Sequence, residues 1–325
     1  LSYSFQSVVV VADGSAWRFD GTDLVQITDP DLGSPIDVTW IDNYYFFTDG
    51  EYLFHTDIGD ETSIDPLKFA TSELSPDPTK AVGRTQDNLV IVFNRYTTEY
   101  FINQGSENFA FSRINQKAVN AGIVGTHAWC EMDGNIFILG GRKEESASFH
   151  MLTAGTTTPL STRYVDKVLN SYTEEQLSTA VIESRIVARD KLIYLYLPNE
   201  VLLYNHTIAE GLGVGVAWSR LTTGSHDEKW RPCNGIFDPL LNKCIYGDSS
   251  EFGQISFMDQ STASQYGYPT DMEFTTPLVP LESMSVDEVE LNTISGFNQE
   301  AVTLFVSTTR DGAIYSQEWS KEASA

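Results

Sequence analysis

The side chains in this sequence that could carry out catalysis or bind a metal are five histidines and many carboxylates. The histidines have no HxH or HxxxH spacing, so they predict no metal site; they are His55, His127, His150, His206 and His226. Neither a GxSxG nucleophile elbow nor a P-loop is present, which excludes two common signatures of hydrolases and nucleotide-binding proteins. The sequence thus predicts no catalytic residue, no metal and no cofactor.

Many of the aspartates precede a glycine, and this pairing has a structural explanation. A two-residue type I′ turn needs a positive φ at both central residues, which Asp-Gly tolerates, so each pair predicts a β-hairpin. The pairs are Asp13-Gly14, Asp20-Gly21, Asp49-Gly50, Asp133-Gly134 and Asp311-Gly312. A glycoside hydrolase would need two carboxylates held at a fixed separation on rigid strands, and the sequence alone selects no such pair.

The glycine-rich stretch GLGVG at 211–215 has the composition of a phosphate-binding loop. Such a loop presents its amides to the phosphate at the start of a helix. Here a polar turn, HTIAE at 206–210, precedes the stretch and a strand is expected after it. We therefore interpret it as a flexible connection.

The length and composition are those of a folded protein with one large domain or two ordinary ones: 325 residues, 41% hydrophobic and 12% aromatic. No run approaches 18 apolar residues, so no membrane span is predicted. The cysteines Cys130, Cys233 and Cys244 are widely separated and form no CxxC motif, which fits a reducing compartment.

The formal net charge of −25 is the most pronounced global property. It argues against a general nucleic-acid-binding surface, because affinity for duplex DNA comes mainly from Lys and Arg that neutralise phosphates. Two interpretations remain open. One is that the acidic residues serve solubility, and the other is that they line a surface past which DNA moves without being held.

The segment 161–204 contains the one clear helical pattern, followed by strands. Five apolar residues fall at offsets 0, 1, 4, 5 and 8, which is one face of a helix; they are Tyr164, Val165, Val168, Leu169 and Tyr172. Thr173 and Gln176 then predict a capping box at the start of a second short helix. The sequence predicts a helical insertion at about 161–181, and three antiparallel strands after it, with turns at Asp190 and at Pro198-Asn199.

Similar groups of strands recur along the chain. Their middle strands centre on Trp17, Phe46, Ile91, Phe137, Tyr194 and Ile245, at intervals of 29, 45, 46, 57 and 51 residues. Four of these intervals are near those of propeller blades, whose stacking buries faces that a lone meander would expose. The sequence therefore predicts an all-β fold, a β-propeller over 1–260, with an incomplete or irregular first blade. A Greek-key β-sandwich, with shorter and more even strand spacing, is the alternative.

Outside the strands, two long segments are expected to be irregular, 57–78 and 104–124. Pro66, Pro76 and Pro78 should keep the first of them out of strand ladders. From 261 to 325 the blade spacing stops, while alternating strands continue at 286–292 and 302–308. This part predicts a small β-sandwich-like domain that is incomplete at its end.

The chain also resembles a known family, the packaged-DNA stabilisation proteins of short-tailed bacteriophages, also called tail accessory factors or tail hub proteins. The likeness is strongest where a helix ends in Ser-Tyr-Thr with acidic residues after it, and a meander with a Leu-Pro turn follows. These positions are Ser171, Tyr172, Thr173, Glu175, Glu183, Leu197, Pro198, Val201 and Tyr204. It continues colinearly through the stretches 46–77, 97–105, 117–127 and 306–315.

The resemblance implies a structural virion protein of the tail, assembled in the bacterial cytoplasm, and not an enzyme. It implies a ring of six subunits below the portal and its adaptor ring, near a tail needle or spikes, with duplex DNA passing through the lumen without specific binding. It also implies that family members extend beyond this chain at both ends. A lumen lined with carboxylates would let DNA slide.

Two other functions remain as alternatives, a glycoside hydrolase with carboxylates at one end of the propeller axis and a non-catalytic binding propeller. For the tail role, the helical insertion is the candidate assembly contact, through Tyr164, Val168, Tyr172, Glu174 and Glu175. The alternative for this insertion is that it only caps the edge of the propeller.

Overall fold

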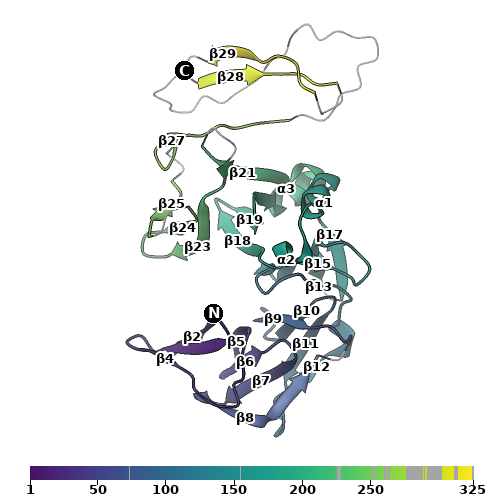
Figure 1. Cartoon of the computed structure of the whole chain (residues 1–325), viewed down its shortest axis with the longest axis vertical. Helices are drawn as coiled ribbons and strands as arrows, with labels where there is room; N and C mark the ends of the chain where they lie inside the picture. Colours follow the sequence, from purple (N-terminus) through teal and green to yellow (C-terminus); the bar gives the residue numbers. More distant parts are fainter. Residues whose placement is uncertain are drawn as a thin grey trace.

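The strands of the protein form consecutive antiparallel sheets, each a meander of neighbouring strands. The structure is a computed structural model that describes residues 1–72, 74–153, 155–224, 228–250, 253–259, 262, 264–275, 288, 290, 302–310 and 314–323. Within this part of the chain the first six sheets are the blades of a β-propeller, and Figure 1 shows them following one another around a ring. The predicted all-β propeller is therefore confirmed.

The first three blades have four strands each. Blade 1 consists of β1 (Ser2–Tyr3), β2 (Val8–Ala12), β3 (Ser15–Phe19) and β4 (Leu24–Gln26). Blade 2 consists of β5 (Asp37–Ile41), β6 (Tyr44–Thr48), β7 (Tyr52–Asp57) and β8 (Asp60–Thr71). Blade 3 consists of β9 (Thr79–Arg84), β10 (Val90–Asn94), β11 (Thr98–Asn103) and β12 (Phe111–Arg113). Blade 1 is thus not short of strands, although β1 and β4 are only 2 and 3 residues long.

In the described part of the chain, the later blades have five, five and three strands. Blade 4 consists of β13 (Gly122–Ile123), β14 (Trp129–Met132), β15 (Asn135–Gly141), β16 (Ser148–Thr153) and β17 (Thr156–Pro159). Blade 5 consists of β18 (Val181–Val187), β19 (Asp190–Tyr196), β20 (Val201–Asn205), β21 (Trp218–Thr223) and β22 (Glu228–Lys229). Blade 6 consists of β23 (Pro232–Asp238), β24 (Lys243–Asp248) and β25 (Ile255–Phe257).

The described residues beyond blade 6 form two short hairpins. The first pairs β26 (Ser264–Gln265) with β27 (Tyr268–Pro269), and the second pairs β28 (Val302–Val306) with β29 (Trp319–Ala323). A bridge between Thr309 and Tyr315 extends the second hairpin toward its turn. Of the predicted strand at 286–292 the structure describes only Glu288 and Glu290, so this strand stays a prediction, as does the predicted domain boundary at 260–261.

The core of the propeller lies at the junctions between blades, where apolar faces of neighbouring sheets meet. One cluster of buried side chains joins blades 1 and 2, a second joins blades 2 and 3, and a third joins blades 5 and 6. The largest spans blades 3, 4 and 5 and includes the helical insertion. Each junction therefore buries a sheet face that a single meander would leave in water.

The helical insertion folds as its sequence pattern predicts. It forms α1 (Arg163–Leu169) and α2 (Glu174–Leu177), and the capping box of Thr173 and Gln176 is present with both of its hydrogen bonds. Val165, Leu169 and Leu177 are buried in the largest core cluster. The insertion therefore packs into the junction of blades 4 and 5.

A third helix replaces the polar turn that the sequence predicts at 206–210. It is α3 (His206–Leu212), and the side-chain oxygen of Asn205 accepts a hydrogen bond from the amide of Ile208 at its start. Gly213, at φ 94°, ends it before the 3-10 turn η2 (Val214–Val216). The glycine-rich stretch at 211–215 is thus the end of a helix.

The predicted irregular segments contain strands. Most of 57–78 belongs to β8, and 104–124 contains β12, the short helix η1 (Asn115–Lys117) and β13. In the pairing of β7 with β8 the register shifts between Ile64 and Phe69. Pro66 lies in this shift, where its missing amide costs no ladder hydrogen bond. The prediction that proline would exclude a strand here was wrong, because the strand accommodates it in a bulge.

The four Asp-Gly pairs that the structure describes divide into two kinds of turn, and Asp311-Gly312 lies outside the described residues. Asp13-Gly14 and Asp133-Gly134 have positive φ at both residues, as a type I′ turn requires. At Asp20-Gly21 and Asp49-Gly50 only the glycine has a positive φ, and the aspartate carboxylate instead accepts the amides two and three residues later. Asp190 is paired in β19, and the turn before it is Ala188-Arg189, at φ 49° and 82°.

Candidate functional site: the axial cavity and the blade junctions

A cavity of about 750 Å³ lies where the first strands of the blades converge on the propeller axis. It is lined by β1 of blade 1, β5 of blade 2, β9 of blade 3, residues 126–129 of blade 4 and β18 of blade 5. The first strands can converge because each sheet is a meander that begins at the axis and proceeds outward. Residues of five blades therefore meet at this cavity.

Asp37 is the carboxylate on the blade 2 wall of this cavity. It accepts a hydrogen bond from its neighbour's amide, Val38 N, and one from Val82 N in blade 3, both at 2.9 Å. Burial raises the pKa of Asp37 to about 6, because a charged carboxylate loses solvation there. Its oxygens bind backbone amides, so it joins two blades.

Glu183 is the carboxylate on the blade 5 wall, and it acts in the same way toward blade 6. Its Oε2 accepts hydrogen bonds from Arg185 Nη2 at 3.0 Å and from Gly235 N at 3.3 Å. Arg185 Nη2 also donates to the carbonyl of Gly235, and Arg185 Nη1 donates to the carbonyl of Ser184 at 2.6 Å. The pair thus fastens the first strand of blade 6 to that of blade 5.

The rest of the lining combines aliphatic and hydroxyl side chains with aromatic and basic ones. The Arg84 guanidinium lies over the Trp40 ring, 5.7 Å from its centroid, and Trp129 and His127 line the blade 4 side. Burial lowers the pKa of His127. The two carboxylates of the lining, Asp37 and Glu183, already accept hydrogen bonds from neighbouring blades. They hold the blades together and do not form a free carboxylate pair for glycoside hydrolysis.

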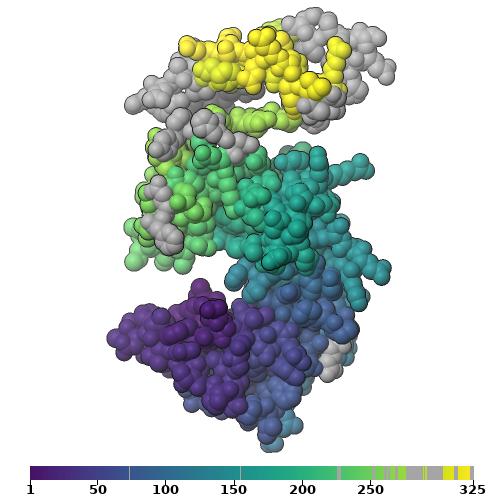
Figure 2. All heavy atoms as spheres, in the orientation of Figure 1, coloured from purple at the N-terminus to yellow at the C-terminus, as the bar shows by residue number. Residues whose placement is uncertain are grey.

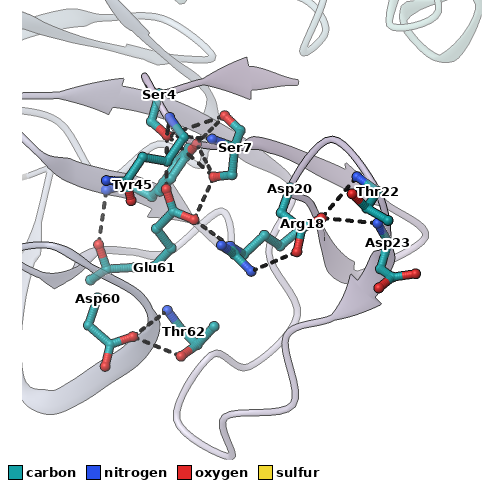
Figure 3. Close-up of polar contacts among 12 residues, drawn as sticks. Ser4, Ser7, Arg18, Asp20, Thr22, Asp23, Tyr45, Asp60, Glu61 and Thr62 are labelled. Atoms are coloured by element: carbon teal, nitrogen blue, oxygen red, sulfur yellow. Dashed lines mark hydrogen bonds and ion pairs between the residues drawn. The ribbon is translucent and has the colours of Figure 1, made fainter.

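A second polar cluster fastens blade 1 to blade 2, and Figure 3 shows its side chains converging on Glu61 of β8. The Glu61 carboxylate accepts hydrogen bonds from Ser4 Oγ at 2.9 Å, from Ser7 Oγ at 2.5 Å and from Arg18 Nε. Burial alone would raise the pKa of Glu61, but these three hydrogen bonds outweigh it and hold the pKa below its usual value. Tyr45 Oη donates to the Ser7 carbonyl at 3.0 Å.

Replacing Glu61 with glutamine is expected to lower the free energy of unfolding by about 1.5–3 kcal/mol, because charge-assisted hydrogen bonds contribute that much and the substitution removes the charge. Urea unfolding followed by circular dichroism measures it. Asp60→Asn is the matched control, since Asp60 bonds only within its own turn, to Thr62. A Glu61→Gln effect no larger than that of the control would contradict the role of Glu61.

The other junctions use similar bridges. Asp42 of blade 2 accepts hydrogen bonds from Asn88 Nδ2 at 2.8 Å and Asn103 Nδ2 at 3.0 Å, both in blade 3. Glu131 of blade 4 accepts one from the Gln86 amide of blade 3 at 3.0 Å. Lys191 of blade 5 pairs with Asp133 of blade 4 at 2.9 Å. Carboxylates that bond across blade junctions are thus a repeated feature of this fold.

His55 is a buried base at the junction of blades 2 and 3, with 2% of its surface exposed. Its Nδ1 lies 2.8 Å from the Thr56 carbonyl, and its Nε2 accepts a hydrogen bond from the Ala110 amide at 3.2 Å. These partners fix the neutral ring with its proton on Nδ1. Burial lowers the pKa of His55, because protonation would put an unpaired charge beside Phe109 and Phe111.

This arrangement predicts a loss of stability in acid. Because the folded pKa of His55 is below the unfolded value of about 6.5, its contribution is complete above pH 6.5 and is lost as the pH falls toward the folded pKa. The loss is at most about 1.4 kcal/mol per pH unit. Urea unfolding at pH 7.5 and 5.5 should show a smaller pH effect in His55→Gln than in the parent, since both chains share all carboxylates. An equal pH effect in both would refute the prediction.

The remaining histidines do not gather into a site. His127 lines the axial cavity, His150 lies in β16 and His206 begins α3, while His226 lies outside the described residues. Among the residues that the structure describes, no group of three or more His, Cys, Asp or Glu is placed to hold a metal ion. Nor is any helix there long and apolar enough to span a membrane.

The five predicted assembly residues differ in their surroundings. Val168 and Tyr172 pack against the largest core cluster, and the Glu174 carboxylate forms an ion pair with Arg95 of blade 3. Tyr164 is 55% exposed, and Glu175 is also exposed. The structure thus leaves Tyr164, Glu174 and Glu175 accessible, and of these Glu174 is engaged by Arg95.

Sequence analysis missed the residues that join the blades. Asp37 and Glu61 were not selected, and Glu183 appeared only through the family resemblance. Their common signal is a carboxylate inside or at the start of a strand with no glycine after it. A turn does not explain a carboxylate at such a position, so a hydrogen-bond donor elsewhere in the fold is expected to pair with it.

Comparisons with known protein families agree with this architecture. A family model described as "Bacteriophage P22 Gp10, beta-propeller" matches residues 1–263, and one described as "Bacteriophage P22 Gp10, beta-sandwich" matches residues 271–324. The chain is 28% identical over 329 residues to the tail hub protein gp10 of Salmonella phage P22, covering 96% of this chain and 68% of that protein.

The solved structures to which the chain is similar include a propeller and an extracellular domain. The Dos1 propeller has a TM-score of 0.48 at 8% identity, covering 81% of each chain. The extracellular domain of the putative hybrid two-component system BT3049 from B. thetaiotaomicron has a TM-score of 0.47 at 12% identity, covering 84% of this chain and 35% of that one.

Proposed function

The chain belongs to the bacteriophage P22 Gp10 family, and from this we propose that it builds part of the head-to-tail channel of a short-tailed phage, below the portal and its adaptor. Membership makes it a structural tail hub protein of the virion and not an enzyme. The observation that carries the proposal is that the family model of the P22 Gp10 propeller matches residues 1–263. In that propeller, the carboxylates Asp37 and Glu183 form hydrogen bonds between blades. In the channel it would stabilise the packaged DNA and conduct it during ejection.

The proposed assembly is a closed ring of six copies. A tail hub joins other tail components around an axis, and head-to-tail contacts between identical subunits close into rings when the rotation between them allows it. The proposed neighbours are the portal-adaptor ring on one side and the tail needle or spikes nearby. Tyr164 and Glu175, two exposed residues of the helical insertion, are the proposed contact.

The charge supports passage of DNA without binding. The net charge is −25, and several of the basic side chains are engaged by carboxylates of the same chain, as in the pairs Arg18–Glu61, Arg95–Glu174 and Lys191–Asp133. A cation that is already paired with a carboxylate adds little affinity for DNA phosphate, and unpaired carboxylates repel the phosphate. Duplex DNA would therefore slide through such a lumen.

Reconstitution with the portal-adaptor assembly of the same phage tests this function. Analytical ultracentrifugation and electron microscopy should show rings of the chain added below the adaptor, and mobility-shift assays should show no binding of a 30-bp duplex at 50 mM salt. A stable monomer that ignores the adaptor would overturn the proposal. Tight salt-dependent DNA binding would overturn the sliding role.

Substitution within the insertion tests the contact. Tyr164→Asp should weaken ring formation and leave the thermal unfolding midpoint unchanged, because the side chain is exposed. Val168→Ala is the matched control in the same helix, since Val168 packs against the core and should affect stability more than assembly. If Tyr164→Asp formed rings as readily as the parent, the proposal that the helical insertion contacts the neighbouring subunit would be wrong.

A further inference from the structure

The charge of the chain is distributed unevenly between its blades. Residues 1–67, which contain blade 1 and most of blade 2, have 13 Asp and Glu but a single Lys or Arg, which is Arg18. Their net charge of −12 is about half of the −25 of the whole chain. The segments 142–147 and 163–169 of blade 4 and α1 have four basic and three acidic side chains, a net charge of +1. The two regions therefore differ in the sign of their charge.

Four exposed basic side chains form what is called here the basic patch. They are Arg142, Lys143, Arg163 and Lys167. The two segments that carry them lie side by side, because Ser148 Oγ at the start of β16 donates a hydrogen bond to Asp166 Oδ1 of α1 at 2.6 Å. Arg142 has one ion pair, with the exposed Glu145 at 3.8 Å, and the other three have none among the residues that the structure describes. Their charges are therefore available to a partner.

Carboxylates of blades 1 and 2 lie at the same end of the strands as the basic patch. In a meander blade, the turn after the second strand and the connection to the next blade are at one end, and the other turns are at the opposite end. The β15–β16 turn and α1 occupy that end in blade 4. The β2–β3 turn, the connection after β4 and the β6–β7 turn occupy it in blades 1 and 2. The carboxylates there, called the acidic patch, are Asp13, Asp31, Asp49 and Glu51.

The two patches lie on opposite sides of the propeller. Blade 1 and blade 4 are three blades apart among six, and Figure 2 shows blade 1, in purple, on the left and the teal atoms of blade 4 and the insertion on the right. A ring with head-to-tail contacts needs two different and complementary surfaces on each subunit. Patches of opposite sign, on opposite sides and at the same end, meet this requirement.

We propose that the basic patch of one subunit docks on the acidic patch of the next subunit around the ring. This inference rests on the proposed ring and names the surface that the helical insertion contacts. Two copies with a net charge of −25 repel each other, and this approach brings opposite charges together. Complementary charges fix the orientation of two surfaces more than they add affinity. The exposed ring of Tyr164, beside Arg163 on α1, adds an apolar contact within the basic patch.

Charge reversal tests the docking. One variant carries Arg163→Glu with Lys167→Glu, and the other carries Asp31→Lys with Glu51→Lys; all four side chains are exposed. Each should weaken association of the subunits by at least about tenfold, because like charges across an interface are strongly unfavourable. The net charge becomes −29 in the first variant and −21 in the second, since each double reversal changes the −25 of the chain by four. General repulsion alone would make the second variant associate more strongly, so its weaker association reports the docking.

Combining the four reversals in one chain provides a rescue. The two patches then exchange their signs, the net charge returns to −25, and the chain should assemble more readily than either double variant. The matched control is Glu107→Lys with Asp190→Lys, two exposed positions at the other end of blades 3 and 5. Its net charge is also −21, and it should associate no more weakly than the parent. Sedimentation velocity of the whole chain, with and without the portal-adaptor assembly, measures association, and circular dichroism checks the fold.

The outcomes separate this contact from the ring itself. Rings that form in the parent and in both double variants alike would overturn the docking and leave the proposed ring intact. A four-residue variant that assembles no better than the double variants would overturn the docking as well. If the parent forms no ring even with the adaptor, the proposed ring is wrong and this contact with it. Duplex binding by the parent that Arg163→Glu with Lys167→Glu abolishes would assign the basic patch to DNA and overturn the docking.

Discussion

Replacing Trp230 with alanine is expected to lower the free energy of unfolding by about 3–5 kcal/mol, the usual cost of removing a buried aromatic side chain. Trp230 is 3% exposed. Its ring stacks on Tyr194 at a centroid distance of 5.4 Å and an interplanar angle of 8°, and the edge contact with Tyr246 is at 6.1 Å. Because Tyr246 belongs to blade 6, the loss should be felt mainly where blade 6 packs on blade 5.

Urea unfolding combined with hydrogen exchange measures this effect and its location. The global stability should fall, and amides of β23 and β24 should exchange faster than those of blades 2 to 4. Trp319→Ala is the matched control, since Trp319 in β29 is 60% exposed and its loss should cost less than about 0.5 kcal/mol. Uniformly faster exchange in all blades would mean that blade 6 is not separately attached through Trp230.

The propeller could be predicted because its signals are local and repeated. Continuous apolar runs in β6, β10, β15 and β19, with turn residues between them, mark the middle of these blades without knowledge of the partners. The capping box at Thr173 and Gln176 is equally local, because both residues belong to one turn. Such features depend on the chain near them, and the sequence shows them directly.

The misses had two causes. The helix α3 begins with Asn205 as its cap and consists of residues with no strong apolar periodicity, so a polar turn was an equally good interpretation. The turn Ala188-Arg189 has two non-glycine residues at positive φ, which local preference disfavours. Here the pairing of β18 with β19 over seven residues overrides the local preference.

The residues that join the blades lie beyond sequence reasoning for a different reason. Glu61 is separated by 54 residues from Ser7 and by 43 from Arg18, and Asp37 by 45 from Val82. Which carboxylate meets which amide depends on how the sheets stack around the axis. A strand carboxylate without a turn indicates that some partner exists, but it does not identify the partner.

Replacing Gly122 with alanine is expected to lower the free energy of unfolding by about 3 kcal/mol or more, because there is no room for a methyl group at the junction of blades 3 and 4. An added Cβ would lie 2.1 Å from the Asn94 carbonyl oxygen and 2.6 Å from Arg95 C and Tyr96 N. These are backbone atoms. The Asn94 side chain is itself held by Thr79 and Thr97 at 2.9 Å.

Gly141, the residue paired with Gly122 across the sheet, is the matched control. Its added Cβ would meet nothing closer than the Ser146 carbonyl at 3.4 Å, so Gly141→Ala should change stability by less than about 0.5 kcal/mol. Thermal and urea unfolding of the two variants gives the comparison. Similar effects for both would show that the junction can separate enough to accept a methyl group.

A third glycine shows why the backbone contact matters. The Cβ of Gly83→Ala would lie 2.3 Å from the Trp129 ring, which is a side chain. Shortening that side chain in Gly83→Ala with Trp129→Leu should therefore recover part of the stability that Gly83→Ala loses, since neighbouring substitutions are not additive. No side-chain substitution should recover Gly122→Ala in this way. If Asn94→Ala restored the stability of Gly122→Ala, the obstacle would be the Asn94 side chain and not the backbone of blade 3.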